Sequence, residues 1–297
     1  MIKTISTAQQ SMALRQITAR QKTEMDQASR ELATGLKSDV FAAPGSMPSR
    51  ALELRAQMVA NDAYIAANTG LAAKLEVTAM SLDEVRGSAG EFKNLLISGD
   101  IASMNRSTLQ DTARGVMQSL VGTLNGTYNG EHIFSGTQTD QRPLTIEAGE
   151  TVSYSGGVED VTTRIDDDNV LHHGIRADHP AFGDIFDALS LVVNTDLDAM
   201  STGEFTAFQR QTAEAMAAAE TEIVAMQARL GDNQARLERT IVRQSEMSRI
   251  YSSSILDIEG VEPEEAALRV EALSNQLQST FAVTARMSRL SFLNFMN

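Results

Sequence analysis

The chain has 297 residues, no cysteine and a formal net charge of −14. The absence of cysteine excludes disulfides, thiolate metal sites and cysteine nucleophiles. Residues 131–204 carry 15 acidic side chains and only 3 basic ones. The acidity is therefore concentrated in the middle of the chain, and the sequence offers no basic patch for nucleic acid.

The N-terminal region predicts one amphipathic helix over residues 4–36, ending near Gly35. Residues 1–7 lack the continuous apolar core of a secretory signal peptide, so we expect any export to proceed without a cleaved signal. An isolated helix with one modest apolar stripe is only marginally stable in water, so this helix should pack against a partner. Its predicted assembly residues are Ile5, Met12, Ile17, Met25 and Leu32.

Pro48 opens a second, longer helix. Its apolar positions advance in alternating steps of four and three residues from Leu54 to Leu82, which is the repeat of a coiled coil. After one short step the seam continues at Val85, Ala89, Phe92 and Leu96. Asn61 and Asn68 fall on this seam. Two interpretations stay open: these amides select the register or the partner, or the seam is exposed to water at this level.

A shorter helix is predicted over 106–124, and the pattern then changes. Turn signals and short alternating runs over 126–180 predict strands and hairpins. An apolar helix follows Pro180. Because this region is acidic as well as irregular, we expect it to form a small insert with a solvated surface.

The third long helix is predicted over 204–258, with a seam from Phe208 to Ile241 that includes Ala215. Pro263 begins the last helix. Both terminal helices lack the basic face of membrane-surface helices, and no run reaches the roughly 18 apolar residues of a membrane span, so no membrane partner is expected. The predicted assembly residues of the last helix are Val270, Leu273, Leu277, Phe281, Met287, Leu290 and Phe292.

The order of elements predicts a mainly α protein with a small α+β insert. Two long helices that flank an insert pair most simply as an antiparallel hairpin or coiled coil, and the terminal helices then meet each other. We expect three parts. They are residues 1–43 with 263–297, residues 44–130 with 204–262, and the insert 131–203.

Residues that could carry chemistry are few, and all four histidines lie in the middle: His132, His172, His173 and His179. Neighbouring residues of a strand point to opposite faces, so His172 and His173 predict a polar turn between strands rather than a metal site. No phosphate-binding glycine loop and no nucleophile elbow is present. We expect no enzymatic activity and no cofactor.

Several segments resemble the flagellin superfamily. They are residues 27–37, with Leu-Ala-Thr-Gly-Leu-Lys; residues 48–55; residues 230–238, with Leu-Gly-Asp-Asn-Gln-Ala-Arg-Leu; and the C-terminal helix, with Leu-Ser-Phe-Leu-Asn-Phe-Met. The segment 128–140, with Ile-Phe-Ser-Gly, and Pro143 resemble the subfamily of hook–filament junction proteins within it. The chain departs from the family at Ala42-Ala43-Pro44, where Asp-Asp-Pro is common.

The resemblance implies an extracellular structural subunit at the junction between the flagellar hook and filament. It implies a flagellin-like fold, a homo-oligomeric ring, a second hook-associated protein and flagellin as neighbours, and type III export with a chaperone on the C-terminal helix. Two alternatives remain. One is a filament flagellin, and the other is a secreted coiled-coil adhesin or effector whose insert binds a ligand.

Overall fold

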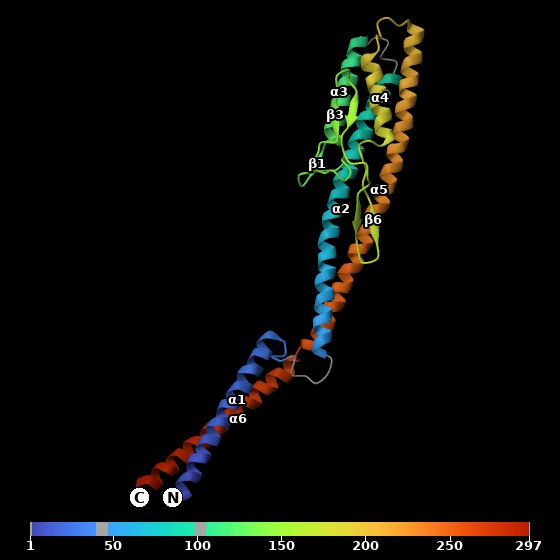
Figure 1. The fold of residues 1–297 in the computed structure, drawn as a ribbon. Coiled ribbons are helices and arrows are strands. Elements are labelled where there is room, and N and C mark those ends of the chain that lie inside the picture. The colour runs from blue at the N-terminus through green and yellow to red at the C-terminus, as the bar shows by residue number, and fades with distance from the viewer. Residues whose placement is uncertain (1, 40–46, 99–104, 297) are drawn as a thin grey trace. The chain divides into compact units, whose positions relative to one another are not determined.

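The computed structural model describes residues 2–39, 47–98 and 105–296 (Figure 1). The chain divides into two compact units. We call Met1–Asn61 with Glu246–Asn297 the terminal unit, and Asp62–Ser245 the central unit. The helices α2 (Met47–Ile97) and α5 (Thr202–Glu259) contribute to both.

In the terminal unit, α1 (Ile2–Thr34) packs along α6 (Pro263–Met296), and both chain ends lie at the same end of this pair (Figure 1). The first turns of α2 and the last turns of α5 also pair. Asn61 donates a hydrogen bond of 2.7 Å to Ser248, and Arg55 forms an ion pair with Glu259. The predicted pairing of the terminal helices is confirmed.

The central unit contains the main hydrophobic core, which joins α2 and α5 with α3 (Arg106–Leu124) and α4 (Pro180–Asn194). The two long helices run antiparallel, since Lys93 near the end of α2 pairs with Glu220 near the start of α5. The predicted α2 seam is confirmed by its burial. Its residues with at most 4% exposure are Asn68, Leu75, Leu82, Val85, Ala89, Phe92 and Leu96.

One position of the predicted seams is wrong, and one of the two interpretations left open for Asn68 is excluded. Ala215 is exposed, because the buried face of α5 passes through Ala213 and Met216 while Ala215 lines a groove beside α4. Asn68 is fully buried, so the interpretation of a water-exposed seam does not hold at that position. The physical reason is that a hairpin packs over Asn68 and excludes water from it.

The strands form three separate two-stranded antiparallel ladders. They are β1 (Thr127–Tyr128) with β2 (Glu131–His132), β3 (Leu144–Ile146) with β4 (Val152–Tyr154), and β5 (Thr162–Arg164) with β6 (Val170–His172). The β1–β2 turn is Asn129-Gly130, with φ of 52° and 84°. Such positive φ values suit Asn-Gly and match the twist of a tight hairpin, so the predicted turn is confirmed.

Candidate assembly surface

The contact between α1 and α6 follows heptad spacing on both helices. The buried or half-buried positions that follow this spacing are Leu14, Thr18, Gln21, Met25 and Ala28 on α1, and Ala266, Val270, Leu273, Leu277, Thr280, Thr284 and Met287 on α6. Steps of four and three residues separate them, as in a coiled-coil seam. Many of these side chains are small or polar, so the seam buries little apolar surface for its length.

Gln21 makes the seam weaker still. Its side chain is 6% exposed, and its Oε1 atom has no hydrogen-bond partner. A buried acceptor without a partner costs about 1–3 kcal/mol. The buried, unpaired oxygen of Gln21 therefore destabilises the contact between α1 and α6.

Other large apolar side chains of α1 and α6 lie outside this seam. Met12 is 65% exposed on α1 and Phe281 is 57% exposed on α6. Other exposed members of these two helices are Ile17, Leu32, Leu268 and Val283. We call these six residues the outer face. Complete burial of such a side chain is worth roughly 1.5–3 kcal/mol, so the outer face favours contact with another surface.

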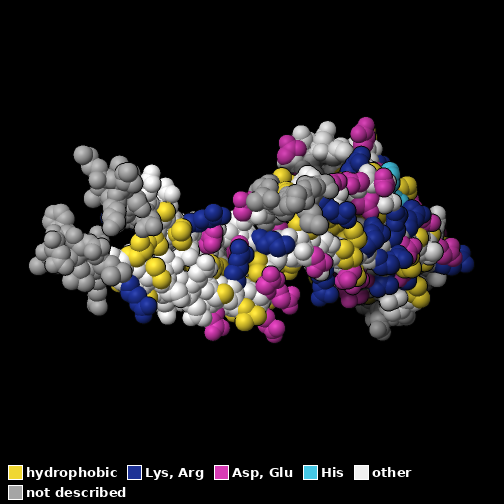
Figure 2. Space-filling view, turned by 90° about the horizontal axis from the view of Figure 1, so that it is seen from below, with side chains coloured by type: hydrophobic (Ala, Val, Ile, Leu, Met, Phe, Trp, Pro, Cys, Tyr) yellow, Lys and Arg dark blue, Asp and Glu magenta, His cyan; other side chains and the backbone are white. Residues whose placement is uncertain are grey.

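The two units differ in how they use apolar side chains. Among the described residues, the terminal unit has 6 buried hydrophobic residues and 11 exposed large ones, whereas the central unit has 36 and 7. In Figure 2, the surface next to the undescribed chain ends shows mainly hydrophobic and uncharged side chains. Because exposed apolar patches mark interaction sites, the terminal unit is the part of the chain that needs a partner.

The structure sorts the predicted assembly residues into two groups. Met25, Val270, Leu273, Leu277 and Met287 lie in the seam between α1 and α6. Met12, Ile17, Leu32 and Phe281 belong to the outer face. The side chains of Ile5, Leu290 and Phe292 lie outside the described residues. Sequence periodicity does not separate the two groups, because it does not show which face of each terminal helix packs against the other helix.

Three hydrogen bonds join the end of α1 to the connection between α5 and α6, and the sequence did not predict them. We call these three bonds the lock. The backbone N–H of Lys37 donates to the Glu259 carbonyl at 2.8 Å, and that of Val261 donates to the Gly35 carbonyl at 2.9 Å. The ammonium group of Lys37 also donates to the Ile258 carbonyl at 2.8 Å. The end of α1 is thereby fixed to the α5–α6 connection.

Glycine is required on both sides of this lock. Gly35 has φ of 69°, which disfavours other residues. A Cβ at Gly260 would lie 2.4 Å from the Leu256 carbonyl oxygen. In the sequence, Gly35 and Gly260 mark the ends of α1 and α5. That these two helix ends contact each other becomes known only from the structure.

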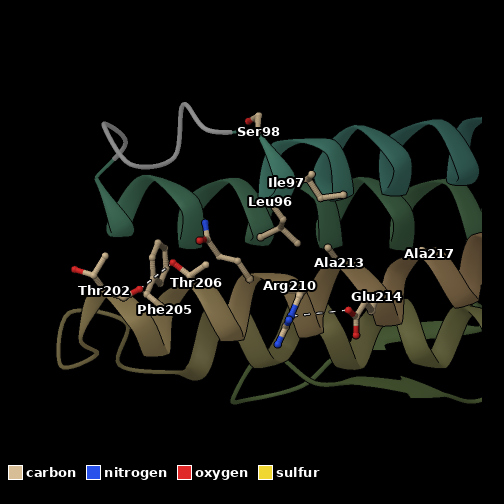
Figure 3. Close-up of a pocket in the computed structure, with 11 residues that line it drawn as sticks. Leu96, Ile97, Ser98, Thr202, Phe205, Thr206, Arg210, Ala213, Glu214 and Ala217 are labelled. Atoms are coloured by element: carbon tan, nitrogen blue, oxygen red, sulfur yellow. Dashed lines mark hydrogen bonds and ion pairs between the residues drawn. The ribbon is translucent and has the colours of Figure 1, made fainter.

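A groove of about 590 Å³ lies in the central unit where α2 ends and α5 begins (Figure 3). Leu96 and Ile97 face Phe205 across it, while Arg210 and Glu214 form a loose ion pair of 4.0 Å at its edge. Both charged side chains are largely exposed. The groove is open and mainly apolar, and it brings no group of catalytic side chains together.

A polar turn between strands is present, but the prediction that His172 and His173 form it is wrong, because His172 ends β6 and His173 follows that strand. Asp166 closes the turn between β5 and β6 by accepting hydrogen bonds from the backbone of Asp168 and Asn169. His172 is exposed, whereas His173 is buried. Within residues 2–39, 47–98 and 105–296, no three His, Asp or Glu side chains are grouped as metal ligands would be. None of the described helices is long and apolar enough to cross a membrane.

The fold and the surface define a class of protein: a predominantly helical chain with a long antiparallel helix hairpin, paired terminal helices and a small β-containing insert. Residues 5–139 match the family model for the bacterial flagellin N-terminal helical region, and residues 213–296 match that for the C-terminal helical region. Together these segments cover more than half of the chain. The chain belongs to the bacterial flagellin family.

Solved structures share this fold. A putative flagellar hook-associated protein from Vibrio parahaemolyticus has 16% sequence identity and a TM-score of 0.62, over 74% of this chain and 100% of that one. Bacillus cereus FlgL has 20% identity and a TM-score of 0.54, covering 69% and 99%. The junction protein FlgL from Legionella pneumophila has 12% identity and a TM-score of 0.54, covering 69% and 98%. No curated protein matches the chain in sequence.

Proposed function

We propose that this protein is a structural subunit of the bacterial flagellum, located at the junction between hook and filament. Membership of the flagellin family supports the flagellar role. The similar solved structures that are described as hook-associated or junction proteins support the position. The observation that carries the proposal is the outer face, because a terminal unit with more exposed than buried large apolar residues requires neighbours.

In this proposal, each part of the chain has a separate place in the assembly. Residues 1–43 with 263–297 form an inner tube in which the outer faces of neighbouring subunits contact one another. Residues 44–130 with 204–262 form a surrounding shell of long helices. The acidic insert, residues 131–203, faces the solvent, where its charge is tolerated.

The proposed partners are further copies in a ring and adjacent axial proteins, namely a second hook-associated protein and flagellin. The subunit functions outside the cell after export without a cleaved signal peptide. Before export, a chaperone covers the C-terminal helix. This step is reasonable physically, since the exposed apolar residues of α6, including Leu268 and Phe281, would otherwise promote aggregation.

Complementation of a deletion strain of the source bacterium tests the function. We expect the deletion to leave hooks without filaments and to abolish motility. The wild-type gene should restore both. Phe281→Asp should fail, whereas Val158→Asp, at an exposed position of the acidic insert, should succeed. A motile deletion strain would contradict the flagellar role and favour the adhesin or effector alternative.

Polymerisation of the purified protein separates the junction role from that of a filament flagellin. A junction subunit is expected to form no long filaments by itself. Long filaments grown from this chain alone would show the filament flagellin alternative to be correct.

A further inference from the structure

A polar layer interrupts the apolar contact between α2 and α5 in the central unit. Asn68 is fully buried, and Gln244 and Thr240 are only 4% and 6% exposed. Burying an amide costs several kcal/mol unless it finds hydrogen-bond partners. This layer is therefore stable only if something supplies those partners.

The β5–β6 hairpin supplies an acceptor for both amide NH2 groups, while the Oδ1 atom of Asn68 is left without a partner. Asn68 Nδ2 donates to the Ile165 carbonyl at 2.8 Å, and Gln244 Nε2 donates to the same oxygen at 2.9 Å. The two amides are also joined directly, with Asn68 donating to Gln244 Oε1 at 3.0 Å. One backbone carbonyl thus bridges a residue of α2 and a residue of α5.

Further contacts attach the hairpin to both helices, along which it lies in Figure 1. On the α2 side, Tyr64 donates to Asp167 at 3.0 Å. On the α5 side, Arg243 pairs with Asp166 at 2.8 Å, and Asn233 donates to the His172 carbonyl at 2.9 Å. Strands of three residues in a two-stranded ladder are not stable alone, so the hairpin and the polar layer stabilise each other.

His173 lies just after β6, on the buried side of this hairpin. Its side chain Nε2 lies 2.9 Å from the Thr163 hydroxyl. The charged groups nearby are Lys74 of α2 and Glu131 of β2, which pair with each other at 3.2 Å. Burial, followed by the charge of Lys74, lowers the pKa of His173 to about 4. The folded hairpin therefore favours the neutral imidazole.

We propose that the β5–β6 hairpin is a strap that closes the polar layer between α2 and α5, and that protonation of His173 releases it in mild acid. A cationic imidazole must regain water, and in this proposal it does so when the hairpin leaves the helices. Asn68 and Gln244 then lose their shared partner, and the helix pair loosens at that level.

The carboxylate of Asp166 does not account for release in this pH range. Burial raises the pKa of Asp166, but hydrogen bonds from Asn169 and the backbone, together with Arg243, outweigh burial and hold that pKa below its ordinary value. Its hydrogen bond to Asp167 raises the pKa of Tyr64. His173 favours folding in its neutral form, so its contribution is complete above about pH 6.5 and declines towards pH 4.

Hydrogen exchange of the full chain between pH 7.5 and 4.5, corrected for intrinsic exchange rates, tests the strap. We expect peptides from 161–174, 62–75 and 238–246 to lose protection at least tenfold in acid, while α3 stays protected. His173→Phe should abolish this response, and His172→Gln, a change at the exposed neighbour, should retain it. Unchanged protection of the wild-type strap at pH 4.5 would overturn the proposal.

A second variant covers the case in which His173→Phe does not fold. Lys74→Met removes the charge that opposes protonation, so release should move to higher pH and the NMR titration of His173 should shift in the same direction. A response identical to wild type would also overturn the proposal. Neither outcome depends on the flagellar role, which complementation tests separately.

Discussion

At the scale of the residue, Gln21 limits the stability of the contact between α1 and α6. Its Oε1 atom is buried without a partner between α1 and α6. Gln21→Leu replaces this amide with an apolar side chain and should stabilise the pair by about 1 kcal/mol. Hydrogen exchange measures this change, and we expect peptides from α1 and α6 to be protected roughly fivefold more strongly than in the wild type. Gln16→Leu, at an exposed position of the same helix, should have no such effect.

Single polar residues were also the hardest to interpret from the sequence. Asn68 was placed correctly on the α2 seam by its spacing, yet neither interpretation included the contact it makes. Its partner is the Ile165 carbonyl, 97 positions away in the chain. Every residue has a backbone carbonyl, so no sequence pattern indicates which one will be used.

At the scale of the element, the structure separates two kinds of apolar position on α6. Leu277 faces α1 and is 8% exposed, whereas Phe281 is on the outer face. Leu277→Asp buries a charge in the seam and should unpair α1 from α6. Phe281→Asp should leave the pair intact and prevent only the contact between subunits. Hydrogen exchange of α1 in the two purified variants distinguishes these results, and equal loss of protection in both would contradict the division.

The long elements were predictable because their periodicity is strong. The seam of α2 repeats over many turns, and Pro48, Pro180 and Pro263 mark helix starts that the structure places within one residue. The strands were predictable as a region, through turn signals such as Asn129-Gly130. Their pairing into three separate ladders depends on which helices cover them, and local sequence contains little information about that.

At the scale of the whole molecule, the different roles of the insert and the terminal helices could be predicted from their composition. The acidic middle and the nearly neutral ends already predicted an exposed insert and helices that need partners. What the sequence left open was the orientation of the terminal helices. Their seam combines polar residues such as Thr18 and Gln21 with apolar ones, and other large apolar residues of the same helices face outward. A pattern of apolar positions alone does not tell which of them lie in the seam.

Photo-crosslinking at position 281 in flagella of the source bacterium tests most directly the claim that the outer face forms contacts between subunits. The benzoyl derivative of phenylalanine can replace Phe281 with little change in shape, and it reacts only with immediate neighbours. We predict crosslinks to α1 or α6 of a second copy or to another axial protein, with none from the same group placed at Val158 in the solvent-facing insert. An incorporated subunit that gives no intermolecular crosslink at position 281 would contradict the account.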